Sequence, residues 1–261
     1  MKTFAIVNRK GGVAKTTTAI NLAYILATSY KKRVLLIDAD SQGNASSILP
    51  PDTQVGGGLA SVLNGMADYY PDVVYETDIP ELDLLPASDE LGDIDLACIT
   101  NGVEPNFYAL KGLRDAVEED DAYDVVVIDC PPYFSVSCLN AITAADRIII
   151  PTDTDAFSAG GMSRLVKQID SIRQACPNVS VSGCLVTKYH RADVVEGAVD
   201  YLRQGAALHI FETVIRRTDK VQESTWAGQA AAQWSPFCGA SRDYRAWVAE
   251  LLEWEGMRCG V

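Results

Sequence analysis

The chain has 261 residues, of which 48% are apolar and 22% are charged, as is ordinary for a soluble globular protein with one large core. The formal net charge of −13 argues against nucleic acid as a partner unless basic residues cluster locally. No apolar run reaches the ~18–20 residues that a membrane span needs. The residues ahead of the first glycine pair are too few for a signal peptide. We therefore expect a cytoplasmic protein with a single domain.

Short apolar runs alternate with segments of helical length. The predicted strands are residues 3–8, 33–38, 124–129, 147–151 and 179–187. The predicted helices are residues 15–30, 109–119, 137–145, 160–175, 194–205 and 239–253. Two of the strands are apolar on both faces, which is typical of strands buried between two layers of helices. The pattern predicts an α/β fold with a doubly wound, mostly parallel sheet flanked by helices, and a ligand site beyond the carboxyl ends of the strands.

The seven cysteines are scattered and form no CxxC pair. Such spacing does not support a zinc or iron–sulfur site, and we expect buried, reduced thiols. They are Cys98, Cys130, Cys138, Cys176, Cys184, Cys238 and Cys259.

Residues 8–17, NRKGGVAKTT, join the first predicted strand to the first predicted helix. Gly11 and Gly12 permit the close backbone approach of a phosphate cradle, and the helix N-terminus favours negative charge. Lys15 supplies a charge to the β- and γ-phosphates, and the Thr16 hydroxyl is a suitable Mg²⁺ ligand. The segment is therefore a candidate phosphate loop, although it departs from the strict G-x-x-x-x-G-K-[ST] pattern.

This loop resembles the deviant Walker A motif, K-G-G-x-x-K-[TS], of the ParA/MinD family of P-loop ATPases. The resemblance implies ATP and Mg²⁺ as cofactors. The implied nucleotide-binding residues are Lys10, Gly11, Gly12, Val13, Ala14, Lys15, Thr16 and Thr17. The family usually has glycine where this chain has Ala14, a small departure that concerns loop geometry and turnover. The resemblance also implies a catalytic role for Lys10, which would reach across a homodimer interface to the ATP of the partner protomer, as an arginine finger does.

Acidic residues end two further strands. Residues 34–44, VLLIDADSQGN, are similar to the family segment LLIDxDPQGN, and Asp38 and Asp40, two positions apart, can both face the phosphates. Residues 123–132, YDVVVIDCPP, are similar to YDxxxIDxPP and place Asp129 in the Walker B position. The resemblance implies that Asp40 activates the attacking water and acts in catalysis with Lys10 and Lys15. It also implies a metal site of Thr16, Asp38 and Asp129.

A distal segment is basic in a chain that is otherwise acidic. Residues 213–224, TVIRRTDKVQES, are similar to the ParA segment TVIPRNxRLSEA. Arg216, Arg217 and Lys220, together with Arg191 after the last predicted strand, could neutralise DNA phosphates without reading sequence. A solvated basic edge or a wall of the adenine pocket remains the alternative for these residues.

The resemblance is closest to the Soj-like partitioning ATPases of the ParA kind. It implies an ATP-sandwich homodimer that binds non-specific DNA and is stimulated by a ParB-like centromere-binding partner. One alternative is a MinD-like or protein-tethered positioning ATPase. The acidic tail at residues 251–261 lacks the basic amphipathic character of a membrane helix, so no membrane partner is expected. The other alternative is a metabolic ATP-dependent enzyme of similar fold, such as a dethiobiotin synthetase.

Overall fold

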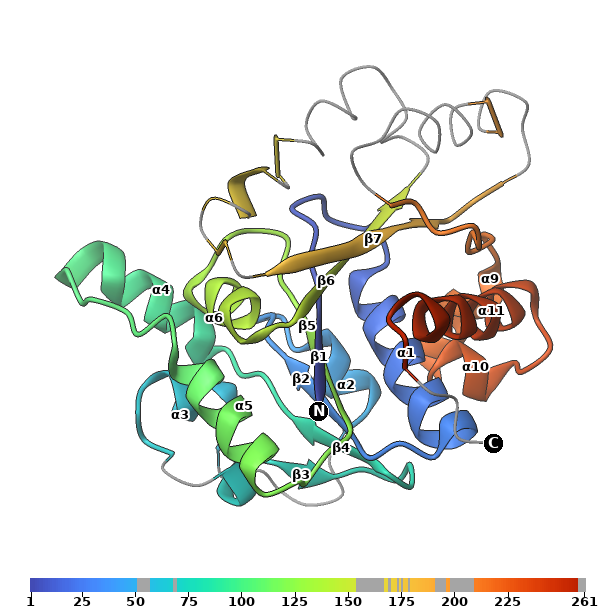
Figure 1. Ribbon diagram of the computed structural model, residues 1–261. Helices are drawn as coiled ribbons and strands as arrows, with labels where there is room; N and C mark the ends of the chain where they lie inside the picture. The colour runs from blue at the N-terminus through green and yellow to red at the C-terminus, as the bar shows by residue number, and fades with distance from the viewer. Residues whose placement is uncertain are drawn as a thin grey trace.

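The structure is a computed structural model that describes residues 1–50, 57–67, 70–153, 167–168, 170–172, 174, 176–177, 179–190, 196–197 and 209–257. Its described strands form one sheet in the order β3-β4-β2-β5-β1-β6-β7 (Figure 1). The strands are β1 (Lys2–Ile6), β2 (Val34–Asp38), β3 (Tyr75–Glu76), β4 (Leu82–Leu85), β5 (Val125–Asp129), β6 (Arg147–Asp153) and β7 (Ser180–Thr187). All neighbouring strands run parallel except β3, which pairs antiparallel with β4.

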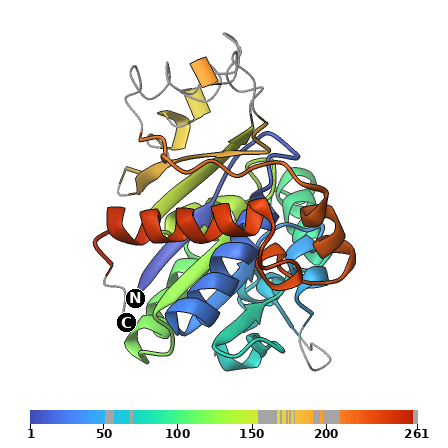
Figure 2. The ribbon, with the colours of Figure 1, turned by 90° about the vertical axis from the view of Figure 1, so that its right-hand side faces the viewer.

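Helices cover both faces of the sheet (Figures 1 and 2). The longer ones are α1 (Lys15–Tyr30), α4 (Glu90–Asn101), α5 (Ala109–Glu119), α6 (Val136–Ala144) and α11 (Gly239–Trp254). The shorter ones are α2 (Asn44–Ile48), α3 (Leu59–Leu63), α9 (Asp219–Trp226), α10 (Ala231–Trp234) and a 3₁₀ turn, η1 (Tyr70–Asp72). The arrangement is a doubly wound α/β sheet, which confirms the predicted fold class.

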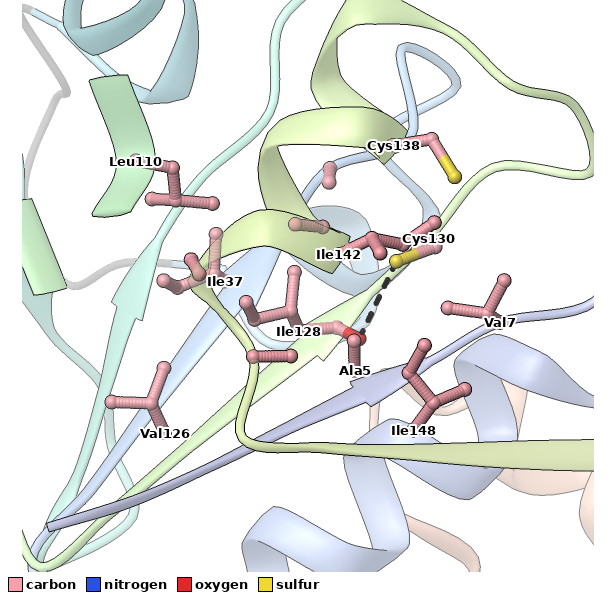
Figure 3. Packing of buried hydrophobic residues seen from close by; sticks show 14 of the residues in the cluster. Ala5, Val7, Ile37, Leu110, Val126, Ile128, Cys130, Cys138, Ile142 and Ile148 are labelled. Carbon is pink, nitrogen blue, oxygen red and sulfur yellow. Dashed lines mark hydrogen bonds between the residues drawn. The ribbon is translucent and has the colours of Figure 1, made fainter. Parts of the chain in front are cut away.

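Strand periodicity divides the core into two layers. In β1, Phe4 packs with the helices α1 and α11, whereas Ala5 packs on the opposite face with α5 and α6. Figure 3 shows the second layer, where Ile128 of β5 and Ile142 of α6 lie close together. These side chains are fully or almost fully buried, so the central strands are apolar on both faces, as their sequences predict.

The predicted bounds hold closely where the chain is described. The helices α1 and α5 begin and end at the predicted residues, and each of the five predicted strands is found within about two residues of its expected ends. The short strands β3 and β4 and the helix α4 were not predicted. The predicted helices at 160–175 and 194–205 lie largely outside the described residues.

The cysteines with described positions are all free thiols. Cys130, Cys138 and Cys184 are buried, as expected, whereas the other three are only partly buried. Cys259 lies outside the described residues. Within the part of the chain that is described, no helix is both long and apolar enough to cross a membrane.

Candidate nucleotide site

The predicted site residues meet at one edge of the sheet. The strands β1, β2 and β5 end at this edge, and their register places Asp38 of β2 directly beside Asp129 of β5. The loop after β1 leads into α1, which begins at Lys15. The sheet topology therefore brings together the phosphate loop and both acidic strand ends, as the sequence predicts.

Two residues of the phosphate loop have left-handed backbone conformations. Gly12 has φ +74°, which glycine adopts without strain. Ala14, the N-cap of α1, has φ +64° and ψ +36°, and it provides no side-chain cap. Its β carbon makes this conformation cost about 1 kcal/mol. The alanine at this position is therefore not a neutral substitution, because the loop keeps the backbone geometry that suits glycine.

Hydrogen bonds from neighbouring strands hold the loop in place. Asn8 Nδ2 donates to the Pro151 carbonyl of β6 at 2.7 Å, and Asn8 Oδ1 accepts from the Lys10 amide at 2.9 Å. The Thr187 hydroxyl, at the end of β7, donates to the Val13 carbonyl at 3.1 Å. The loop is thus anchored on β6 and β7 as well as on β1.

The two lysines of the phosphate loop, Lys10 and Lys15, have different environments. Lys15 is only 7% exposed, and its Nζ donates to the Lys10 carbonyl at 3.3 Å. Burial lowers the pKa of Lys15, and the nearby carboxylate of Asp129 opposes this shift. The ammonium of Lys10 is more exposed and contacts both carboxylate oxygens of Asp153, at the end of β6, at 2.8 Å. Lys15 therefore lies within the loop, whereas Lys10 is held at its rim.

Asp129 is the most unusual group of the site. It is fully buried, and neither carboxylate oxygen has a hydrogen-bond partner among the described residues. Burial raises the pKa of Asp129 well above its usual range, and the negative charge of Asp38 adds to the shift. The Thr16 side chain and the charge of Lys15 act in the opposite direction. An ionised carboxylate buried in this way is costly unless a cation compensates it.

Asp38 and Asp40 differ in their hydrogen bonds and in their access to the cleft. Asp38 accepts hydrogen bonds from the amide and the hydroxyl of Ser46, both at 2.8 Å, and from the Asp40 amide at 3.2 Å. Burial raises its pKa, although these hydrogen bonds partly offset that rise. Asp40 accepts from the Gln42 amide at 3.1 Å and lines an open cleft. Asp38 thus holds the turn that presents Asp40, and its predicted support of a metal stays a prediction.

The cleft above the phosphate loop has a volume of about 880 Å³, within the range of small-molecule sites. Its floor is the loop and the start of α1, with Gly11, Gly12, Ala14, Lys15, Thr16 and Thr17. Its walls come from five further parts of the chain, which include Asp40, Gln42, Asn44, Ile48, Pro132, Tyr133, Thr187, Lys188, Ile215, Arg216, Arg217, Thr218, Asp219, Val221, Gln222, Thr225 and Tyr244.

The distal basic residues lie on one wall of this cleft and at its rim. The side chain of Arg216 forms an ion pair with Asp243 of α11, with its closest contact at 2.7 Å. Lys220 forms an ion pair with Glu223 at 2.6 Å. Arg217 is exposed and pairs with no carboxylate of the described residues. Arg191 lies outside the described residues. Arg216 and Arg217 thus occupy the alternative position, the pocket wall, and DNA contact by these residues stays a prediction.

Sequence reasoning missed two residues of the site. Asp153 lies beyond the predicted strand 147–151 and was assigned no role, and its contact with Lys10 joins positions 143 residues apart. Lys188 follows the last predicted strand and was assigned no role, but the structure places its ammonium near Gly12 of the loop, and its backbone has φ +53°. Only the strand register, which pairs Asp153 with Thr187, brings both residues to the loop.

The donor set fits a magnesium-bound nucleotide. No three His, Cys, Asp or Glu side chains of the described residues are grouped so as to hold a metal by themselves. Mg²⁺ is commonly held by one carboxylate, waters and the phosphates of a nucleotide. The buried carboxylate of Asp129, with Thr16 and Lys15 nearby, matches that requirement.

The fold and the site define a P-loop nucleotide-binding protein, because a Gly-Gly-x-x-Lys-Thr loop joins β1 to α1 and the neighbouring strand β5 ends in a buried aspartate. A family model described as "AAA domain" matches residues 1–181. The chromosome partitioning protein ParA of Caulobacter vibrioides is 33% identical over 98% of this chain and 95% of its own length. The chromosome-partitioning ATPase Soj of Thermus thermophilus is 33% identical over 97% of this chain and 96% of its own. The chain belongs to the ParA/MinD family of P-loop ATPases.

Solved structures agree with this assignment. Cobyrinic acid a,c-diamide synthase from Mycobacterium smegmatis, with bound ATP analogue and magnesium, has a TM-score of 0.79 and 29% identity over 99% of this chain and 97% of that one. MinD from Pyrococcus horikoshii, complexed with Mg-ADP, has a TM-score of 0.78 over 100% of this chain and 99% of that one, and at 21% identity it shows the fold alone. The expected cofactors, ATP and Mg²⁺, agree with the ligands of these structures.

Proposed function

We propose that this chain is an ATP-driven switch that binds Mg-ATP, forms a homodimer around the nucleotide and hydrolyses it slowly to partition a DNA cargo. The observation that carries the proposal is the buried Asp129 carboxylate, which has no described partner and lies by the phosphate loop near Lys15 and Thr16. A cation brought in with a triphosphate would compensate that charge. The names of the ParA and Soj relatives support partitioning as the purpose of the switch.

Within one chain, we assign three roles to the site. The loop amides and Lys15 bind the phosphates, and Thr16 with Asp129 holds the magnesium ion, which neutralises the charge that develops during phosphoryl transfer. Asp40 is only 7% exposed but lines the cleft, so its carboxylate can orient a water molecule for attack on the γ-phosphate.

Lys10 links hydrolysis to dimerisation in this proposal. Its ammonium is bound at the rim of the loop by Asp153, whereas Lys15 lies within the loop and is the lysine placed to bind the phosphates of its own chain. An exposed ion pair of this kind is worth only about 0–1 kcal/mol. Lys10 can therefore leave Asp153 to contact the phosphates of a partner protomer, where it supplies a positive charge in trans.

DNA binding is the finer part of the proposal. Since Arg216 and Lys220 are already paired with carboxylates, Arg217 is the described residue of the basic cluster that is best able to contact DNA phosphates. The net charge of −13 repels DNA, so binding would require the doubled basic surface of the dimer. We expect a ParB-like partner to stimulate hydrolysis, and the ATP form to associate with the nucleoid.

The test combines light scattering with DNA retention in Mg-ATP. We expect wild type to dimerise and to retain random-sequence duplex in a salt-sensitive way, with the log–log slope falling by about 0.9 for each lost phosphate contact. Lys10→Ala is expected to bind ATP but stay monomeric. Arg217→Glu is expected to dimerise without retaining DNA. The control for Arg217→Glu is Lys31→Glu, which makes the same change from a positive to a negative charge. Lys31 is at the C-terminal end of α1, away from the phosphate loop, so this variant should behave as wild type.

Each result has a contrary outcome. An ATP-dependent dimer of Lys10→Ala would refute the role of Lys10 in trans. A wild-type dimer that retains no DNA at any salt would favour a positioning ATPase tethered by a protein. A wild type that stays monomeric with ATP would favour an ATP-dependent synthase, as the name of the Mycobacterium smegmatis structure suggests for that protein.

A further inference from the structure

The segment after β7 is joined both to the phosphate loop and to the cleft wall. The Thr187 hydroxyl donates a hydrogen bond to the Val13 carbonyl of the loop. The Tyr189 amide donates to the Ile215 carbonyl at 2.9 Å, and the Arg217 amide donates to the Tyr189 carbonyl at 2.8 Å. Lys188 lies between these two attachments, so its backbone position is fixed relative to the loop.

The side chain of Lys188 extends over the phosphate loop. A β carbon built on Gly12 would lie 4.0 Å from its Nζ. Lys188 has φ +53°, a left-handed conformation that costs a residue with a β carbon about 1 kcal/mol. Lys188 and Gly12 both line the cleft, as does Lys15.

The charge of Lys188 is uncompensated. It makes no ion pair or hydrogen bond with the described part of the chain, whereas three nearby cations, unlike Arg217, are paired with carboxylates. Lys10 contacts Asp153, Arg216 contacts Asp243, and Lys220 contacts Glu223. A strained lysine that lies over a phosphate loop, with no counter-ion among the described residues, is an arrangement that an anion between the two would complete.

We propose that Lys188 binds the polyphosphate of the nucleotide held by its own chain, as a phosphate contact additional to Lys15. The inference rests on the proposed function, because it requires a nucleotide in the cleft. Lys188 acts in cis as a binding residue, because it reaches the loop near Gly12 from the end of β7. The same charge would also screen the phosphates from the nearby carboxylates of Asp40 and Asp153.

The experiment measures dissociation constants by calorimetry with Mg²⁺ present, for ATP, ADP and adenosine. Lys188→Met keeps the length of the side chain and removes its charge, whereas Lys188→Arg keeps the charge. Lys31→Met is the matched control, because Lys31 also has φ +53° and is exposed, but caps the far end of α1. Thermal unfolding without ligand verifies that each variant is folded.

We expect Lys188→Met to bind ATP and ADP roughly tenfold more weakly, as is typical for the loss of one charge-assisted hydrogen bond. Adenosine binding should be unchanged, Lys188→Arg should restore most of the affinity, and Lys31→Met should match wild type. Equal ATP affinity of Lys188→Met and wild type would overturn the inference while leaving the nucleotide site intact. If Lys188→Met kept its ATP affinity but failed to retain DNA in the assay described above, Lys188 would contact DNA instead, and the inference would be wrong. A wild type that binds neither ATP nor ADP would overturn both the inference and the proposed function.

Discussion

The phosphate-loop edge and the distal basic segment at residues 216–220 lie on the same cleft but handle charge in different ways. At the loop edge, Asp129 is buried without a described hydrogen-bond partner, and Lys188 has no described counter-ion. In the distal segment, Arg216 and Lys220 are each matched with a carboxylate of a neighbouring turn or helix. The loop edge therefore has charged groups that lack a described partner, whereas most charges of the distal segment are already paired.

This difference distinguishes charged groups that are available to bind a ligand from charged groups that are already paired within the protein. Uncompensated groups lower the stability of the free protein and gain free energy when a ligand arrives, so they mark a binding site. Paired surface groups gain little from a new partner, because an existing contact must first be broken. A basic run in the sequence therefore overstates the charge that is available for DNA, and Arg217 is the described member that remains.

Replacing Lys15 is expected to have the largest effect on ATP affinity. The lysine is buried in the loop and can make two charge-assisted hydrogen bonds to phosphates, worth about 4 kcal/mol together. We expect Lys15→Ala to bind ATP roughly 10³-fold more weakly by calorimetry. Unchanged ATP affinity would contradict the phosphate-loop assignment.

Replacing Asp40 would separate binding from chemistry. We expect Asp40→Ala to bind ATP and to dimerise as wild type does, but to hydrolyse ATP roughly 10²-fold more slowly, because a water-positioning carboxylate acts mainly in the transition state. Single-turnover release of phosphate measures the effect. Gln42→Ala, which changes another side chain at the cleft, is the control. A normal rate in Asp40→Ala would transfer the catalytic role to another residue.

Replacing Asp129 tests whether its buried charge lowers the stability of the ligand-free protein. Its pKa is raised by burial, so the ionised form costs stability at neutral pH when no cation is bound. We expect Asp129→Asn to stabilise the free protein by about 2 kcal/mol, which corresponds to roughly 4–8 °C in Tm. The same variant should lose the additional stabilisation that Mg²⁺ gives in the presence of ADP. A lower Tm of the free variant would show that the carboxylate is compensated in the folded protein.

The two regions also differ in how far the sequence predicts them. The loop, Asp38 and Asp129 are local features: a strand, its terminal residue and the turn that follows are consecutive in the chain. The pairing of Arg216 with Asp243 joins residues 27 apart, and the contact of Lys10 with Asp153 joins residues 143 apart. Such contacts depend on helix packing and strand order, which no short pattern encodes. The strand β4 was missed because it is only four residues long and contains Asp83.

The backbone of Ala14 gives the smallest expected effect. Its left-handed conformation costs an alanine about 1 kcal/mol, and glycine removes that cost but adds conformational entropy to the unfolded chain. We expect Ala14→Gly to stabilise the free protein by about 0.5 kcal/mol, measured by chemical denaturation, and to bind ATP at least as tightly as wild type. The matched control is Ala27→Gly, a buried position inside the same helix, where glycine should instead destabilise by about 1 kcal/mol. The opposite signs are the decisive feature, because both variants make the same chemical change. If Ala14→Gly destabilised the protein as Ala27→Gly does, the left-handed conformation of Ala14 would be contradicted.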